Sequence, residues 1–108
     1  MRVFFHPEFP NDVRRFEVDY AQVSNGLAAR FRQEVDGAVD AIKSSPSGAG
    51  HFLTMRSSAV TELRRRNLRA FPFFVLYGVV GDRVLFGAVI PSRSDPLTWL
   101  ARFRQGSR

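Results

Sequence analysis

The chain has 108 residues, enough for one hydrophobic core but too few for separate cofactor and substrate domains, so we expect residues 1–108 to form a single domain. Its 44% hydrophobic and 24% charged residues argue against disorder, and the absence of cysteine excludes disulfides and thiolate metal sites. The net charge of +6, carried by arginine except at Lys43, favours an acidic or phosphate-bearing partner, although a GC-rich genome explains the excess of arginine over lysine equally well.

Neither a signal peptide nor a membrane span is expected. The N-terminal stretch MRVFFHPEFP is interrupted by His6 and Pro7 after three apolar residues, which is too short for the hydrophobic region of a signal peptide. The longest uncharged run, Ala70 to Gly81, is well below the roughly 20 residues that a bilayer requires. We therefore expect a cytoplasmic protein without a membrane partner.

The first half of the chain predicts a strand followed by two helices. The stretch RVFFH is a β-type run that Pro7 ends, and Asn11 or Asp12 offers the side chain for a helix start. Apolar residues recur at helical spacing on both sides of Ser24–Gly26, where glycine is expected to end the first helix. These apolar positions are Val13, Phe16, Tyr20 and Val23 in the first helix, and Leu27, Phe31, Val35, Ala38, Val39 and Ile42 in the second. The pattern predicts a helical hairpin that packs on a sheet, with Phe16 and Phe31 buried between them.

The second half predicts strands. The stretch TELRRRNLRAF, at residues 61–71, precedes a hairpin whose strands run from Phe73 to Val80 and from Arg83 to Ile90 around a tight Gly81-Asp82 turn. The stretch HFLTM at 51–55 is either a short strand or an irregular segment. Both faces of the strand at 73–80 are apolar, and only the tail DPLTWLARF remains to cover the face away from the helices. We therefore expect an uncovered apolar face that needs a partner.

These elements predict an α+β fold. A helical hairpin packs on one face of a mostly antiparallel sheet of about four strands, and the first strand pairs in parallel with a later one. A short C-terminal helix or tail completes the domain.

The candidate binding residues are mostly arginines in and after the predicted strand at 61–71. Arg64, Arg65, Arg66 and Arg69 are candidates for contacts with a target or an acidic partner, although a solvated charged face explains them equally well. Strand alternation sends Arg64 and Arg66 to one face and Arg65 to the other.

The loop and tail after the last strand supply two further candidates. Arg93 follows the strand end in a Ser/Pro loop, and its alternative role is a surface pair with Asp95. Trp99, four residues before Phe103, suits base stacking, but a small helix that seals the core is the favoured interpretation. His6 and His51 lack companions at metal-ligand spacing, so we expect no metal and no cofactor.

The order of elements, together with the stretch LRAFPFFVLYGVVGDRVLFGAVI and the end RSDPLTW, resembles the RelE/ParE superfamily of toxins from bacterial type II toxin-antitoxin modules, closer to ParE than to RelE. The resemblance implies a toxin that a cognate antitoxin neutralises, through an acidic tail, and that inhibits DNA gyrase. Two alternatives stay open: a RelE-like mRNA endonuclease acting on the ribosome, or a non-toxic relative that only binds its antitoxin. None of the three requires a small-molecule substrate.

One departure from the superfamily bears on the nuclease alternative. Relatives often carry a histidine shortly before an arginine after the last strand, whereas this chain keeps Arg93 without a histidine near it. Cleavage of RNA needs a base and an acid, and an arginine can hold a phosphate but cannot transfer protons at neutral pH. If the chain is a nuclease, His51, Arg66 and Arg93 are the catalytic candidates; otherwise we expect no catalytic residue.

Overall fold

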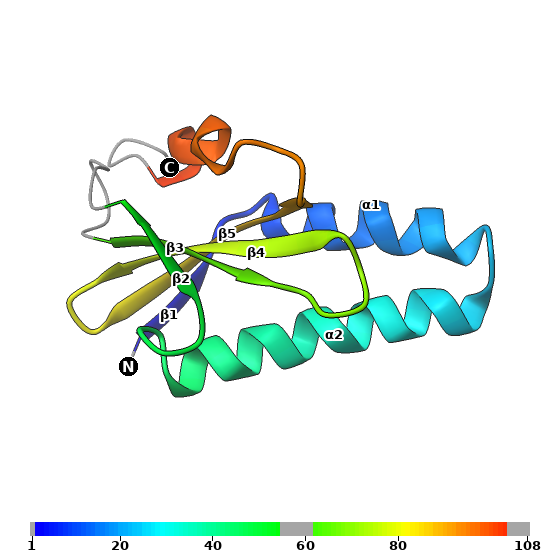
Figure 1. Ribbon diagram of the computed structural model, residues 1–108, viewed down its shortest axis with the longest axis horizontal. Helices are drawn as coiled ribbons and strands as arrows, with labels where there is room; N and C mark the ends of the chain where they lie inside the picture. Colours follow the sequence, from blue (N-terminus) through cyan, green and yellow to red (C-terminus); the bar gives the residue numbers. More distant parts are fainter. Residues whose placement is uncertain (1, 55–61, 104–108) are drawn as a thin grey trace.

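In a computed structural model that describes residues 2–54 and 62–103, five strands, two α-helices and one 3-10 helix are formed (Figure 1). In chain order they are β1 (Arg2–Phe5), α1 (Phe9–Ala21), α2 (Asn25–Ser44), β2 (His51–Thr54), β3 (Glu62–Asn67), β4 (Phe73–Val80), β5 (Arg83–Pro91) and η1 (Pro96–Phe103). The strands form one sheet in the order β1-β5-β4-β3-β2. The pairing of β1 with β5 is parallel and the others are antiparallel, which confirms the α+β prediction. The sheet has five strands rather than about four because β2 pairs with β3.

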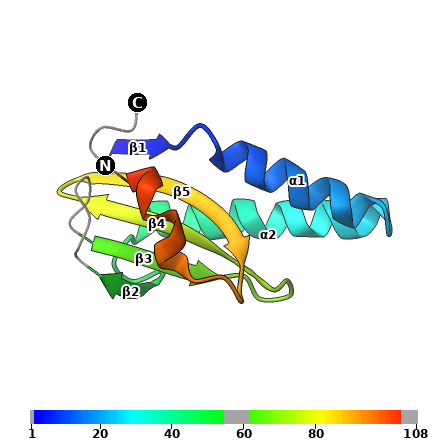
Figure 2. The same ribbon diagram turned by 90° about the horizontal axis from the view of Figure 1, so that it is seen from above.

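The two helices lie side by side on one face of the sheet (Figure 2). The predicted helix boundaries were wrong at two points. The first helix begins at Phe9, with Glu8 as N-cap and Pro10 in the first turn, where the missing N–H of proline needs no partner. Gly26 does not end this helix; it lies in the first turn of α2, where the Ser24 hydroxyl accepts a hydrogen bond of 3.0 Å from the Leu27 N–H. Among the described residues, neither helix combines the length and hydropathy of a membrane-spanning segment.

The β4–β5 hairpin is as predicted, with Gly81 at a φ of 58° in the turn. The preceding strand is shorter than expected, because β3 ends at Asn67 rather than at residue 71. The carboxylate of Glu34 on α2 accepts hydrogen bonds from the backbone N–H groups of Arg69, at 2.8 Å, and Ala70, at 3.1 Å. These bonds hold the chain in a turn against the helix, so the backbone there cannot continue the sheet.

The helix-covered face holds the larger part of the core. Aromatic rings from both layers meet there: Phe31 of α2 lies within 5.4 Å of the ring centroids of Phe71 and Phe73 and within 5.3 Å of that of Tyr20. Phe31 is fully buried, as predicted, whereas Phe16 is partly buried at the edge of the same cluster. The helical hairpin is therefore fixed to the sheet chiefly by aromatic packing.

The opposite face is covered, which corrects the expectation of an uncovered apolar surface. The 3-10 helix η1 crosses this face (Figure 2) and packs Phe103, Trp99 and Leu100 over a buried cluster. That cluster contains Leu63, Phe74, Leu76, Ala88 and Ile90 of the strands. The Phe103 ring lies so close to Gly87 that a β-carbon there would be 2.2 Å from it, so glycine makes room for the ring.

Candidate partner-binding site

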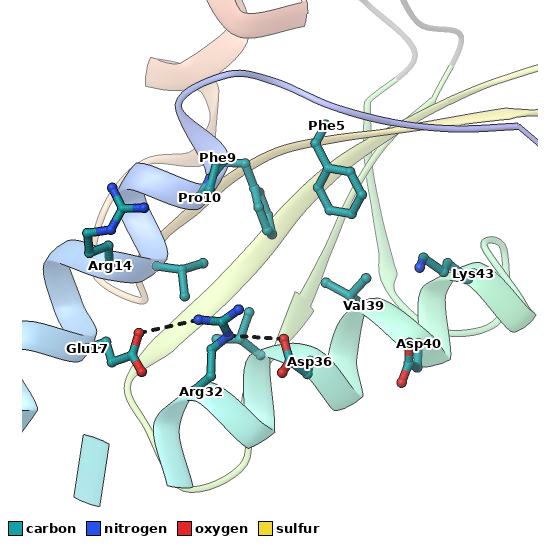
Figure 3. Close-up of a pocket in the computed structure, with 12 residues that line it drawn as sticks. Phe5, Phe9, Pro10, Arg14, Glu17, Arg32, Asp36, Val39, Asp40 and Lys43 are labelled. Carbon is teal, nitrogen blue, oxygen red and sulfur yellow. Dashed lines mark hydrogen bonds and ion pairs between the residues drawn. The ribbon is translucent and has the colours of Figure 1, made fainter. Parts of the chain in front are cut away.

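A groove of about 550 Å³ opens between the β1–α1 corner and one flank of α2 (Figure 3). Phe5, at the end of β1, and Phe9, at the start of α1, line one wall, while Val35 and Val39 of α2 line the other. Phe5 stacks on Phe86 of the sheet with ring centroids 4.7 Å apart, yet 44% of the residue stays exposed. We call this hollow the aromatic groove. It presents apolar surface that a partner's side chain can cover.

Charged residues border the aromatic groove in equal numbers. They are Arg14, Arg32 and Lys43 against Glu17, Asp36 and Asp40. Arg32 bridges two of the carboxylates, with 3.5 Å from Nη1 to Glu17 Oε1 and 3.3 Å from Nε to Asp36 Oδ1, as the dashed lines in Figure 3 show. The groove therefore has an apolar floor and a rim without net charge.

Two of the predicted binding arginines turn inward. Arg64 donates from Nη1 to the carbonyl oxygens of Ser47 and Gly50, both at 3.0 Å, and Arg66 donates from Nη1 to that of Ala49 at 2.6 Å. These bonds fasten the loop between α2 and β2 to the sheet. Arg64 and Arg66 therefore lie on the same face of β3, as the predicted alternation requires. Their guanidinium groups stabilise the loop through these hydrogen bonds, in addition to any contact with a partner.

Arg65 projects to the other face, also as the alternation predicts. Its guanidinium carbon lies 3.8 Å from the centroid of the Phe74 ring, and Nη2 donates to Asn67 Oδ1 at 2.7 Å. His51 of β2 stands directly opposite Arg65 in the antiparallel ladder and is exposed. Directly opposed residues share a face, so the side chains of His51 and Arg65 lie on the same face of the sheet as Phe74, the face that η1 covers.

The remaining candidates lie around the two ends of the central strands. Arg69 is exposed in the β3–β4 turn, where only its backbone N–H is bonded to a described residue. Arg93 is exposed after β5, and within the described residues it makes no pair with Asp95, whose carboxylate instead accepts from the Leu97 N–H at 3.0 Å. Trp99 of η1 packs against the buried cluster on the sheet face away from the helices, which confirms the interpretation that a small helix seals the core there.

The three residues named for a nuclease do not converge. His51 and Arg65 share one face, so Arg66, the next residue on β3, points to the other, where it bonds to Ala49. Arg93 lies past the end of the sheet where Phe73 opposes Pro91. Tyr77 is fully buried and donates to the Pro46 carbonyl at 2.6 Å; burial raises its pKa, partly offset by Arg64 and Arg66. The catalytic roles stay predictions.

One buried ion pair was missed by the sequence analysis. Asp12, only 2% exposed, accepts hydrogen bonds from Arg102 Nη1 at 2.7 Å and from the Val89 N–H at 3.1 Å. Arg102 also donates to the Gly87 carbonyl at 2.9 Å. Asp12 therefore joins α1, β5 and η1 rather than starting a helix. No local sequence pattern predicts this ion pair, because Arg102 lies 90 residues after Asp12 in the chain.

No group of three His, Asp or Glu side chains within residues 2–54 and 62–103 is placed to bind a metal ion. The candidate site thus consists of the aromatic groove, with its apolar floor and the ion pairs of Arg32, and of the arginines on the sheet.

No protein-family model matches the chain, and no curated protein sequence does. Among solved structures, it is similar to a chain described as the "Chromosomal ParDE TA system from P. aeruginosa", with a TM-score of 0.67 and 18% sequence identity. The similarity covers 84% of this chain and 95% of that one. The fold is that of a ParDE-system chain. This confirms the resemblance drawn from the sequence at the level of the fold alone, and in this fold the aromatic groove lies between the β1–α1 corner and α2.

Proposed function

We propose that this protein is the toxin of a bacterial type II toxin-antitoxin module, that it acts in the cytoplasm, and that a cognate antitoxin neutralises it. The observation that carries the proposal is the fold similarity to a chain of a ParDE system over 84% of the residues. A second observation supports it: the aromatic groove presents the half-exposed ring of Phe5 in a hollow that a partner's side chain can enter.

The proposed antitoxin site is the aromatic groove. A disordered antitoxin tail that folds on binding loses about 2 to 5 kcal/mol in ordering, so it must bury apolar area to bind tightly. Phe5, 44% exposed, supplies that area at the surface of the groove. The net charge of +6 draws an acidic tail toward the chain at long range, even though the groove rim itself is balanced.

The proposed target is DNA gyrase, in line with the closer resemblance to ParE. Inhibition by binding needs only a complementary surface, whereas RNA cleavage needs an acid and a base near the phosphate, each worth about 10²- to 10⁴-fold in rate. The separation of His51 from Arg66 across the sheet, and of both from Arg93 along it, favours binding over catalysis.

The RelE-like nuclease remains the second candidate for one reason. The exposed His51 of edge strand β2 lies opposite the half-buried Arg65 of β3, which gives an imidazole and a cation on one face. The third candidate is a non-toxic relative that only binds an antitoxin. It differs from the other two because the host should grow normally when it expresses this chain without an antitoxin.

The antitoxin site is tested by two neighbouring phenylalanines. Phe4 and Phe5 are 43% and 44% exposed, but as consecutive strand residues they point to opposite faces, and only Phe5 lines the groove. The chain is co-expressed with the product of an adjacent acidic reading frame, and complex formation is measured by co-purification and calorimetry. We expect Phe5→Ala to weaken the complex about tenfold or more, and Phe4→Ala to leave it nearly unchanged. Equal affinities for both variants would contradict this site.

The target is tested by three assays on the wild-type chain. We expect inhibition of supercoiling by purified gyrase, growth arrest on expression alone, and no new 5′ ends in messages from induced cells by primer extension. Ribosome-dependent cuts with normal plasmid supercoiling would reject gyrase and favour the nuclease; in that case His51→Ala should abolish the cuts. Normal growth without an antitoxin, combined with tight antitoxin binding, would favour the non-toxic relative.

A further inference from the structure

A second hollow, of about 420 Å³, lies along the opposite flank of α2, against the turn between β3 and β4. Arg30 contributes from α2, and Arg66 and Arg69 contribute from β3 and the turn. Of the described residues that line it, Glu34 alone carries a carboxylate. We call it the arginine hollow. With three guanidinium groups and one carboxylate it carries an excess of positive charge, in contrast to the balanced rim of the aromatic groove.

Glu34 does not neutralise these arginines by pairing with them. Its carboxylate oxygens accept hydrogen bonds from the backbone N–H groups of Arg69 and Ala70, at 2.8 to 3.2 Å. The guanidinium groups of Arg30 and Arg69 are exposed and bond to no described residue, while Arg66 uses Nη1 on the Ala49 carbonyl. At least two planar, positively charged groups therefore border the hollow with their N–H donors available to a ligand.

The apolar residues of the arginine hollow offer a ligand little surface. Ala38, Leu68 and Phe71 are only 5%, 8% and 7% exposed, against 44% for Phe5 in the aromatic groove. A peptide ligand gains most of its affinity from apolar burial, which this hollow does not provide. A ligand with a dense row of negative charges does not need it, because binding releases its condensed counterions.

We propose that the arginine hollow binds the phosphodiester backbone of a nucleic acid. The guanidinium plane matches a phosphate with two parallel N–H···O bonds, which suits Arg30 and Arg69 at the two sides of the hollow. Among the described residues, no exposed aromatic side chain lines the hollow, so bases find no stacking platform there and the contact is independent of sequence. This activity goes beyond the proposed function and stands or falls separately from it.

Binding is measured by fluorescence anisotropy with a labelled single-stranded RNA and a labelled DNA duplex of arbitrary sequence, over a salt series. We expect both to bind the wild-type chain, and Arg30→Gln/Arg69→Gln to weaken binding about tenfold near physiological salt. The slope of log K against log salt should fall by about two for the duplex, and somewhat less for the single strand. The probe, RNA or DNA duplex, whose affinity falls more in the double variant is the nucleic acid that the hollow prefers. Absence of wild-type binding to either probe would overturn the proposal.

A matched control separates a site from net charge. Arg2 and Arg83 are exposed and oppose each other in the β1–β5 ladder, away from the arginine hollow. Arg2→Gln/Arg83→Gln removes the same charge, and we expect it to weaken binding by no more than about twofold. Equal losses in the two double variants would mean that diffuse charge, rather than the hollow, binds the nucleic acid.

Gly37 provides a variant that removes no arginine. It lines the arginine hollow from α2, and a β-carbon at this position would meet nothing within 4 Å. Gly37→Glu adds a carboxylate to the hollow, and Gly37→Gln adds the same bulk without charge; we expect only the former to weaken binding several-fold. If poly-glutamate displaces the labelled strand as well as unlabelled RNA of equal charge does, the assignment to a phosphodiester backbone is wrong.

Discussion

The two faces of the sheet are covered in different ways. On the helix face, Tyr20 of α1 and Phe31 of α2 pack against each other and against the rings of Phe71 in the β3–β4 turn and Phe73 in β4, so each ring has at least two aromatic neighbours. On the other face, η1 rests on its apolar contacts and on the hydrogen bonds of the partly buried Arg102. Damage to the first layer should therefore unfold the molecule, whereas damage to the second should first release η1.

The difference also explains why both faces of β4 are apolar. Each face lies against a layer, and the thinner layer is supplied by a tail that follows the last strand. A tail of eight residues can be replaced or displaced more readily than a pair of helices, because it buries less area and closes fewer hydrogen bonds. The four predictions below test this contrast in stability.

The largest effect is expected for Phe31→Ala. This ring is fully buried in the aromatic cluster of the helix face, so its removal leaves a cavity that should lower the free energy of unfolding by about 3 to 5 kcal/mol. Phe16→Ala should cost less, because Phe16 is only partly buried. Chemical denaturation followed by circular dichroism measures both. A larger loss for Phe16 than for Phe31 would invalidate our account of this layer.

Asp12→Ala should come next, at about 3 kcal/mol. It leaves the Arg102 guanidinium without its carboxylate and the Val89 N–H without its acceptor, in a largely buried position. Asp19→Ala, on the exposed side of the same helix, is the control and should change stability little. Trp99, the only tryptophan, reports on η1 through its fluorescence. Detachment of η1 should shift its emission to the red before circular dichroism detects unfolding; coincident transitions would argue against separate release.

Gly87→Ala should cost about 1 to 3 kcal/mol, because the added methyl group enters the space of the Phe103 ring. The same substitution at Gly37 meets open space in the middle of α2, so it should stabilise the protein by about 0.5 to 1 kcal/mol. Thermal melts of the two variants should therefore move in opposite directions from the wild type. A neutral Gly87→Ala would show that η1 does not depend on the ring position observed here.

The smallest effect concerns pH. Burial, and then the Arg102 charge, lower the pKa of His6 below its ordinary value of 6.5, although Glu8 and Asp12 act in the opposite direction. The unfolded chain therefore binds a proton more readily, so the stability contributed by His6 is present above pH 6.5 and declines as the pH falls through the folded-state pKa. In His6→Asn, the denaturant midpoint should therefore change less with pH than in the wild type, when both are measured between about pH 7 and 5. An unchanged slope would show that other groups cause the dependence.

Much of the fold follows from local patterns. The spacing of Phe16, Phe31 and Val35 determines which helix faces pack, and the Gly81-Asp82 pair identifies the tight hairpin, so both features could be predicted. Helix boundaries were less predictable, since Ser24 serves as N-cap of α2 while Gly26, two residues later, had indicated the end of α1. The length of β3 depends on Glu34, which lies far away in the sequence.

The candidate sites depend still more on distant pairings. Phe5 is identified in the sequence only as an apolar strand residue, and its half-exposed place in the aromatic groove depends on where α2 packs. Arg64 and Arg66 were expected at a surface, but their inward bonds arise from the loop after α2. The arginine hollow combines residues of α2 with those of the β3–β4 turn, so only their juxtaposition in three dimensions distinguishes it from a solvated charged face.

The parallel pairing of β1 with β5 has a consequence for the order of folding. The helical hairpin rests on contacts between neighbouring segments, which form quickly, whereas β1 must wait for β5, and Asp12 must wait for a residue 90 positions later. During synthesis, the N-terminal helices therefore emerge long before the strand and the tail that complete the sheet. The nascent chain passes through a stage with apolar strands unpaired, and this is the stage at which aggregation competes most strongly with folding.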